Sequence, residues 1–124
     1  MKVLLSIKPE YVDKIFAGTK KYEFRKSMFK RKDVSVVVIY ASAPICRIVG
    51  EFQIEDILSD DVKKVWERTH EYSGVTEDFY LSYFCSRKVA TAIQIGQIRK
   101  YSTDRLLSDY NITQAPQSFC YIED

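Results

Sequence analysis

The chain of 124 residues contains little of what metal sites and many hydrolytic enzymes require. Its one histidine, His70, excludes a histidine-rich metal site and any mechanism that needs two histidines. Its four glycines are scattered along the chain, so they form no phosphate-binding loop. We therefore expect neither a metal nor another cofactor.

Cysteines and long apolar runs are also scarce. The three cysteines, Cys46, Cys85 and Cys120, are odd in number, far apart and without Cys-x-x-Cys spacing, so the sequence indicates neither a disulfide framework nor a zinc knuckle. The longest apolar runs, such as Val34 to Tyr40, are far too short to cross a membrane. We expect a cytoplasmic protein without membrane contact.

What the chain does contain is enough apolar surface for one folded domain. Hydrophobic residues make up 46% and aromatic residues 14%, which excludes a disordered chain. The length predicts a single domain over residues 1–124 whose core needs no disulfide or metal.

Positive charge is concentrated in the first third of the sequence. Residues 1–40 hold ten Lys or Arg against four Asp or Glu, a net charge of +6, whereas residues 41–124 carry −4. This asymmetry and the run Lys30-Arg31-Lys32 are typical of a protein that contacts a polyanion. A solvated loop without a partner accounts for the short run equally well.

Hydrophobic periodicity predicts five or six strands and three short helices. We expect strands over residues 3–7, 21–25, 34–41, 45–57, 90–98 and 117–122. Helices are expected to begin at Pro9, at Ser59-Asp60-Asp61 and at Thr76-Glu77-Asp78. Gly18 should cap the first helix, and Ser73-Gly74 should end the second. The order predicts an α+β domain, a mixed barrel or sheet with helical insertions.

The segment from Gly18 to Arg25 carries the most informative pattern. On a strand, Tyr22 and Phe24 point to one face while Lys21, Glu23 and Arg25 point to the other. A carboxylate between cations on one face can line a polar cleft. It can equally form a salt-bridge ladder on the surface, and spacing alone leaves both interpretations open.

The aromatic residues offer a second candidate feature, because single-stranded nucleic-acid binders stack bases on aromatic rings beside cations. Most of the nine tyrosines and seven phenylalanines are expected in the core, among them Phe79 and Tyr83 on the third helix. Tyr40, at the end of a strand and followed by Ala41-Ser42, is the one expected to line the mouth of a site.

The segment from Gly18 to Arg25 resembles the signature of a known protein family. Gly18, Lys20, Glu23 and Arg25 match the Gly-x-Lys-x-x-Glu-x-Arg signature of the ASCH domain. The segments 6–9, 40–44, 48–52 and 115–121 also resemble those of small bacterial and phage members of that family. The resemblance therefore spans nearly the whole chain.

The resemblance implies a PUA-like mixed β-barrel, RNA or a modified nucleoside as partner, and a cleft built on the signature residues. The resemblance, the charges beside the signature and the strand end at Tyr40 together give the candidate ligand-binding residues, which are Lys8, Lys20, Lys21, Glu23, Arg25, Tyr40 and Ser42. Lys20 and Glu23 are the candidates for catalysis if the protein is an enzyme. Binding of RNA or a modified nucleoside without catalysis is the main expectation, and a regulatory role is compatible with it.

An enzymatic alternative and a protein-interaction module both stay open. Related ASCH-like amidohydrolases act on N4-acetylcytidine with a lysine, a threonine nucleophile and a glutamate. In this chain Glu23 occupies the position of the threonine, and Glu71 corresponds only loosely to the distant glutamate, so the same acyl transfer is not expected. Glu23 can instead activate water, with Lys20 or Arg25 stabilising an oxyanion. A ribonuclease activity would need the same groups.

Overall fold

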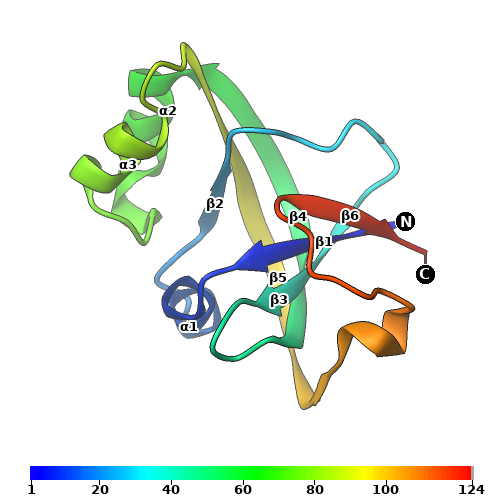
Figure 1. Cartoon of the computed structure of the whole chain (residues 1–124). Helices are drawn as coiled ribbons and strands as arrows, with labels where there is room; N and C mark the ends of the chain where they lie inside the picture. The colour runs from blue at the N-terminus through cyan, green and yellow to red at the C-terminus, as the bar shows by residue number, and fades with distance from the viewer. Residues whose placement is uncertain (124) are drawn as a thin grey trace.

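The computed structural model describes residues 1–123, which form one six-stranded mixed sheet (Figure 1). The strands are β1 (Lys2–Ile7), β2 (Tyr22–Arg25), β3 (Val36–Ala41), β4 (Arg47–Asp61), β5 (Val89–Arg105) and β6 (Phe119–Ile122). Their order across the sheet is β2-β5-β4-β3-β1-β6. Only β1 and β3 run parallel, and the other neighbours are antiparallel.

Three α-helices and two short 3₁₀ helices connect the strands. They are α1 (Pro9–Ala17), α2 (Val62–Thr69), η1 (His70–Tyr72), α3 (Glu77–Tyr83) and η2 (Leu107–Tyr110). The expected ends are confirmed, since Pro9 begins α1 and Gly18 caps it in the left-handed conformation. Among residues 1–123, no helix combines the length and apolar content that a membrane span requires.

The sheet is not closed into the barrel that the family resemblance implies. Within residues 1–123, β2 and β6 are the two edge strands and no backbone ladder joins them. The side chain of Arg25 on β2 instead reaches across the opening, where Nη2 donates to the Ser118 carbonyl at 2.7 Å, just before β6. The α+β class is confirmed, whereas the closed barrel is not.

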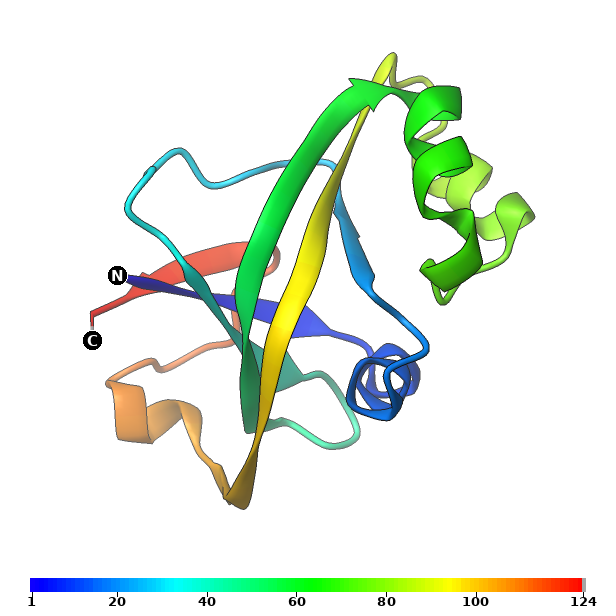
Figure 2. The same ribbon diagram turned by 180° about the vertical axis from the view of Figure 1, so that it is seen from behind.

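Strands β4 and β5 are longer than the sequence indicates. Strand β4 continues to Asp61 because its last residues pair with the beginning of β5, so α2 starts only at Val62. Figure 2 shows β4 and β5 running side by side from η2 to the paired helices α2 and α3. The expected irregularity at Gly50 is confirmed as a shift of register in both of its pairings.

Helices cover different parts of this curved sheet. The largest core cluster includes residues of β1, β3 and β5 with Val12 and Ile15 of α1. A second cluster packs α2 and α3 against Phe24 and against Ala90 and Ala92 of β5. Because Phe24 joins this second cluster, its neighbours Glu23 and Arg25 point to the other face of β2, as the alternation predicts.

The position of α3 depends on its N-cap. The Thr76 hydroxyl accepts a hydrogen bond from the Phe79 amide at 3.1 Å. We predict that Thr76→Ala lowers the free energy of unfolding by about 1 kcal/mol, because that amide loses its partner. Thr76→Ser keeps the acceptor and should retain the stability of the wild type. Urea denaturation measures both, and equal midpoints for wild type and Thr76→Ala would contradict the assignment.

Candidate functional site

A cleft of about 380 Å³ lies between the end of β1 and the edge strand β2. Its walls come from the end of β1, from α1, β2 and α3, and from Gln117 before β6. Four charged residues line it, Lys8, Lys20, Glu23 and Arg25. The volume falls in the range of small-ligand sites.

Lys20 is the most unusual residue in this cleft, because its side chain is a cation that is only 2% exposed. The ammonium Nζ donates a hydrogen bond to the Ser73 carbonyl at 2.6 Å. It also lies 5.2 Å and 5.0 Å from the ring centroids of Tyr11 and Phe24. Burial lowers the pKa of Lys20 to about 8, while the Glu23 charge opposes that shift.

The segment Ser73-Gly74 holds Lys20 in place. The Gly74 backbone has a φ of +71°, and a Cβ there would lie 2.7 Å from both Cβ and Cγ of Lys20. Only glycine therefore lets the chain approach the lysine stem at this point. The sequence predicts this dipeptide as a helix break, but the structure shows that it also accepts the lysine.

Glu23 and Arg25 form an ion pair inside the cleft, with Nη1 of Arg25 3.2 Å from Oε2 of Glu23. Both side chains are mostly buried. Nη2 of Arg25 also donates to Oγ of Ser118 at 3.2 Å, in addition to the carbonyl described above. These fixed contacts leave a rigid, preorganised pair with part of each charge open to the cleft.

Aromatic rings line another part of the cleft. The ring centroids of Tyr11 and Phe79 are 5.9 Å apart, and Phe79 and Tyr83 are stacked at 6.0 Å with planes 13° apart. Lys8 Nζ lies 6.0 Å from the Phe79 centroid. Burial is the main cause of the raised pKa of both Tyr11 and Tyr83, so their phenols stay protonated and can donate hydrogen bonds.

The other expected site residues do not line this cleft. The Lys21 ammonium lies 4.4 Å from the ring centroid of Tyr72, outside it. Alternate residues of β3 belong to two different core clusters. Tyr40 is buried in the cluster that includes Leu4 and Ile48, on the face of β3 opposite to Ile39. Ser42 donates its amide to the Ile7 carbonyl in a turn. Glu71, the loose counterpart of an amidohydrolase glutamate, is exposed and also lies outside the cleft.

Sequence reasoning missed part of the cleft. It assigned Phe79 and Tyr83 to the core; both line the cleft, and Tyr83 also packs against the second core cluster. Their i,i+4 spacing gives one helix face, but the sequence does not reveal which element faces that side. Tyr11 and Ser118 were not among the expected site residues, although Ser118 lies in a segment that resembles the family, because their roles depend on contacts with residues far away in the chain.

The fold and site thus define an α+β domain with a buried lysine and an ion pair at the opening of its sheet. The sequence model of the ASCH domain matches residues 5–113. The chain belongs to the ASCH domain family.

The chain is similar to a protein of comparable length and to parts of longer proteins. The chain is 28% identical over 124 residues to the ASCH domain-containing ribonuclease of Zymomonas mobilis, covering 98% of this chain and 84% of that protein. It is also 27% identical to ATP synthase subunit alpha and 24% identical to large ribosomal subunit protein uL22, both of Ureaplasma parvum. The chain spans only 15% and 39% of the lengths of these two proteins.

A crystal structure supports the same relationship. The ASCH protein of Zymomonas mobilis superimposes with a TM-score of 0.89 at 25% identity, covering 99% of this chain and 88% of that one.

Burial of Lys20 predicts a distinctive dependence of stability on pH. Between about pH 8 and 10.5 the folded protein has released a proton that the unfolded chain still binds, so stability rises with pH in this window. At neutral pH the buried charge costs about 3 kcal/mol relative to a solvated lysine. Lys20→Met fills the same space without charge and should unfold with a free energy equal to or above that of the wild type at pH 7.

The comparison is made by urea denaturation of both proteins from about pH 7 to pH 10. We expect the advantage of Lys20→Met to shrink by about 2 kcal/mol over this range. Tyrosines also titrate near pH 10, but both proteins contain them, so their contribution to stability cancels in the difference. A difference independent of pH would show that the pKa of Lys20 is not lowered.

Proposed function

We propose that this chain binds single-stranded RNA by inserting one nucleotide into the cleft. The observation that carries the proposal is the pairing of a buried Lys20, Glu23 and Arg25 cluster with an open aromatic wall. Cations attract the phosphate backbone, and aromatic rings stack an unpaired base. The name of the Zymomonas relative, a ribonuclease, supports RNA as the ligand class.

The dimensions and charges of the cleft favour one nucleotide rather than a duplex. A base fits against Phe79, which is 37% exposed, and the phosphate fits near Lys8 and Arg25, which also line the cleft. The excess of positive charge over residues 1–40 adds attraction that does not depend on sequence. Residues 1–124 form the unit that we propose to act.

A second candidate function is cleavage of the bound RNA, and the lowered pKa of Lys20 favours it. A lysine with a pKa of about 8 is a better proton donor than an ordinary lysine and is still largely protonated at pH 7. In this reaction Glu23 takes the proton of a ribose 2′-hydroxyl, and the 2′-oxygen attacks the adjacent phosphorus. The bond from phosphorus to the 5′-oxygen breaks, and Lys20 donates its proton to that oxygen.

The products are a 2′,3′-cyclic phosphate and a free 5′-hydroxyl, so the step consumes no water. Arg25 would stabilise the extra negative charge of the phosphorane, because its guanidinium is already oriented by Ser118 and Glu23. The contacts on Arg25 reduce its freedom to reorganise during the reaction.

Glu23→Gln separates binding from cleavage. The amide keeps the size of the carboxylate and a hydrogen bond to Arg25 but cannot take a proton. We predict that the affinity for a labelled octauridylate, measured by fluorescence anisotropy, stays equal or increases, because a negative charge is lost. Cleavage of the same oligomer should fall at least about 100-fold.

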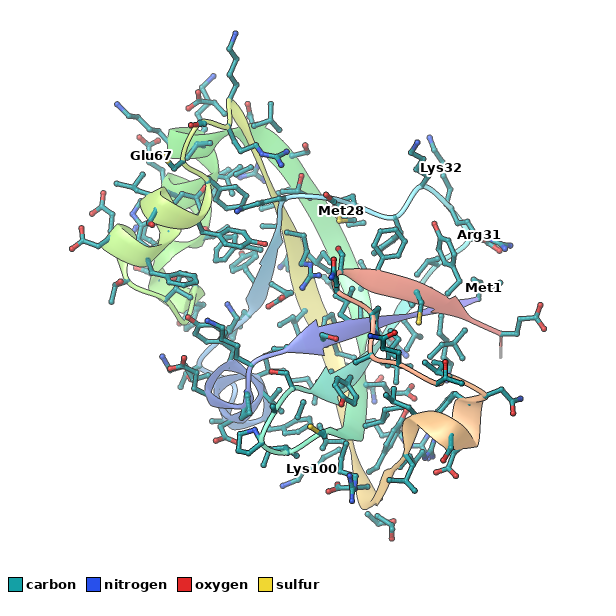
Figure 3. All side chains as sticks on the ribbon, in the orientation of Figure 1. Met1, Met28, Arg31, Lys32, Glu67 and Lys100 are labelled. Carbon is teal, nitrogen blue, oxygen red and sulfur yellow. The ribbon has the colours of Figure 1, made fainter. Side chains whose placement is uncertain are left out.

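Glu67→Gln is the matched control, since Glu67 is exposed on α2 and points away from the cleft (Figure 3). Unchanged cleavage by Glu23→Gln would exclude Glu23 as the base. An unfolded Glu23→Gln protein, seen by circular dichroism, would assign Glu23 a structural role. Acetylated nucleosides tested in the same assay report on the amidohydrolase alternative.

The pH dependence of cleavage tests the role of Lys20. If Lys20 donates a proton, the single-turnover rate should fall as the pH rises through about 8, because the ammonium is lost. Binding measured at each pH shows whether affinity alone explains the loss. A rate that instead increases through pH 8 would mean that the neutral amine acts, as a base.

A further inference from the structure

A second cavity of about 450 Å³ lies beside the cleft, under the connection between β2 and β3. Its lining includes Met28, Ile57 and Thr91 together with Lys30 and Lys32. Ile57 is 39% exposed, so the cavity offers an open apolar surface. The cavity therefore combines apolar side chains with two lysines.

The antiparallel register makes the two cavities neighbours. Arg25 of the cleft pairs directly with Thr91 of the second cavity, and Thr91 pairs in turn with Ser59. Directly opposed residues of antiparallel strands point to the same face, about 5 Å apart. A strand that leaves the cleft past Arg25 can thus enter the second cavity without crossing the sheet.

The loop beside this cavity is bonded to β6 and to its own side chains. The Tyr121 hydroxyl accepts the amides of Lys30 and Arg31 at 3.0 Å and 3.2 Å. The Arg31 guanidinium makes two hydrogen bonds with the carboxylate of Asp33, at 2.9 Å and 2.8 Å. Asp33 therefore neutralises the middle cation of the basic run, and the loop backbone is anchored to β6.

Lys30 and Lys32, in contrast, make no side-chain hydrogen bond or ion pair within the described part of the chain, and both are exposed. Figure 3 shows Lys32 extending outward from the loop, next to Arg31. Lys26 continues the line of charge toward the cleft, with its Nζ 4.7 Å from the ring centroid of Tyr83. One exposed lysine of this connection thus contacts a residue of the cleft, and two others line the second cavity.

We propose that the second cavity is a subsite for the adjacent nucleotide of the RNA strand, with its phosphates held by Lys30 and Lys32. This inference rests on the proposed function and narrows its ligand to an oligonucleotide of at least two residues. The apolar surface of Met28 and Ile57 supports the base, as apolar and aromatic side chains do in other single-strand sites. A free nucleoside would occupy the cleft alone.

The test compares two probes, uridine 3′-monophosphate and a labelled octauridylate, on wild type, on Lys30→Gln with Lys32→Gln, and on the control Lys63→Gln with Lys64→Gln. The control removes the same charge from exposed lysines of α2. Loss of two phosphate contacts should weaken octauridylate binding about 10-fold. The slope of log affinity against log salt should also fall by about 1.4, at about 0.7 per contact for single strands. Affinity for the mononucleotide should not change.

Three outcomes overturn the proposal. Octauridylate binding that is equally weakened in the control would show only a general effect of net charge. Binding that the Lys30 and Lys32 changes leave intact would show that the RNA leaves the cleft by another route, with the proposed function still standing. Failure of the wild type to bind either probe would refute the proposed function and, with it, the subsite.

Discussion

The contact of Arg25 with Ser118 is the interaction on which the arrangement of the site depends. The sheet has two edges that no backbone ladder joins within residues 1–123, and this side chain crosses the gap between β2 and the segment before β6. A guanidinium suits that role because its donors are fixed in a plane and serve several acceptors at once. The opening of the sheet is thus bridged by a residue that also lines the cleft.

Beside Arg25 in the cleft, the buried charge of Lys20 lowers the stability of the folded domain at neutral pH. A buried lysine is rare in a protein core, and the pKa of Lys20 is lowered because burial disfavours its charged form. The lysine is retained with a dedicated carbonyl acceptor at Ser73 and a glycine that admits its stem. Groups with such perturbed pKa values gather at functional sites, which supports a chemical role for the cleft.

The structure shows which cations of the basic run are paired with a carboxylate, and the sequence alone does not. The basic run 30–32 contains one cation paired with Asp33 and two without a protein partner in the described residues. Pairing within the loop keeps its backbone ordered, so less entropy would be lost when a ligand binds. The second cavity beside the run lies on the same face of the sheet as Glu23 and Arg25.

The sequence by itself determined the local features of this protein. Turn and cap residues located α1 through Pro9 and Gly18, and strand alternation assigned Phe24 to the core and Glu23 to the opposite face. These features follow from short-range sterics and from hydrogen bonds between near neighbours. The family signature added the expectation that Lys20, Glu23 and Arg25 act together.

Only the tertiary structure decided how the sheet ends and which distant residues meet. The opening of the sheet, the burial of Tyr40 and the cleft positions of Phe79 and Tyr83 all depend on pairings between segments far apart in the chain. The strand register, in particular, decides which side chains share a face, because a shift of one residue reverses every side chain. No local pattern in the sequence contains that information.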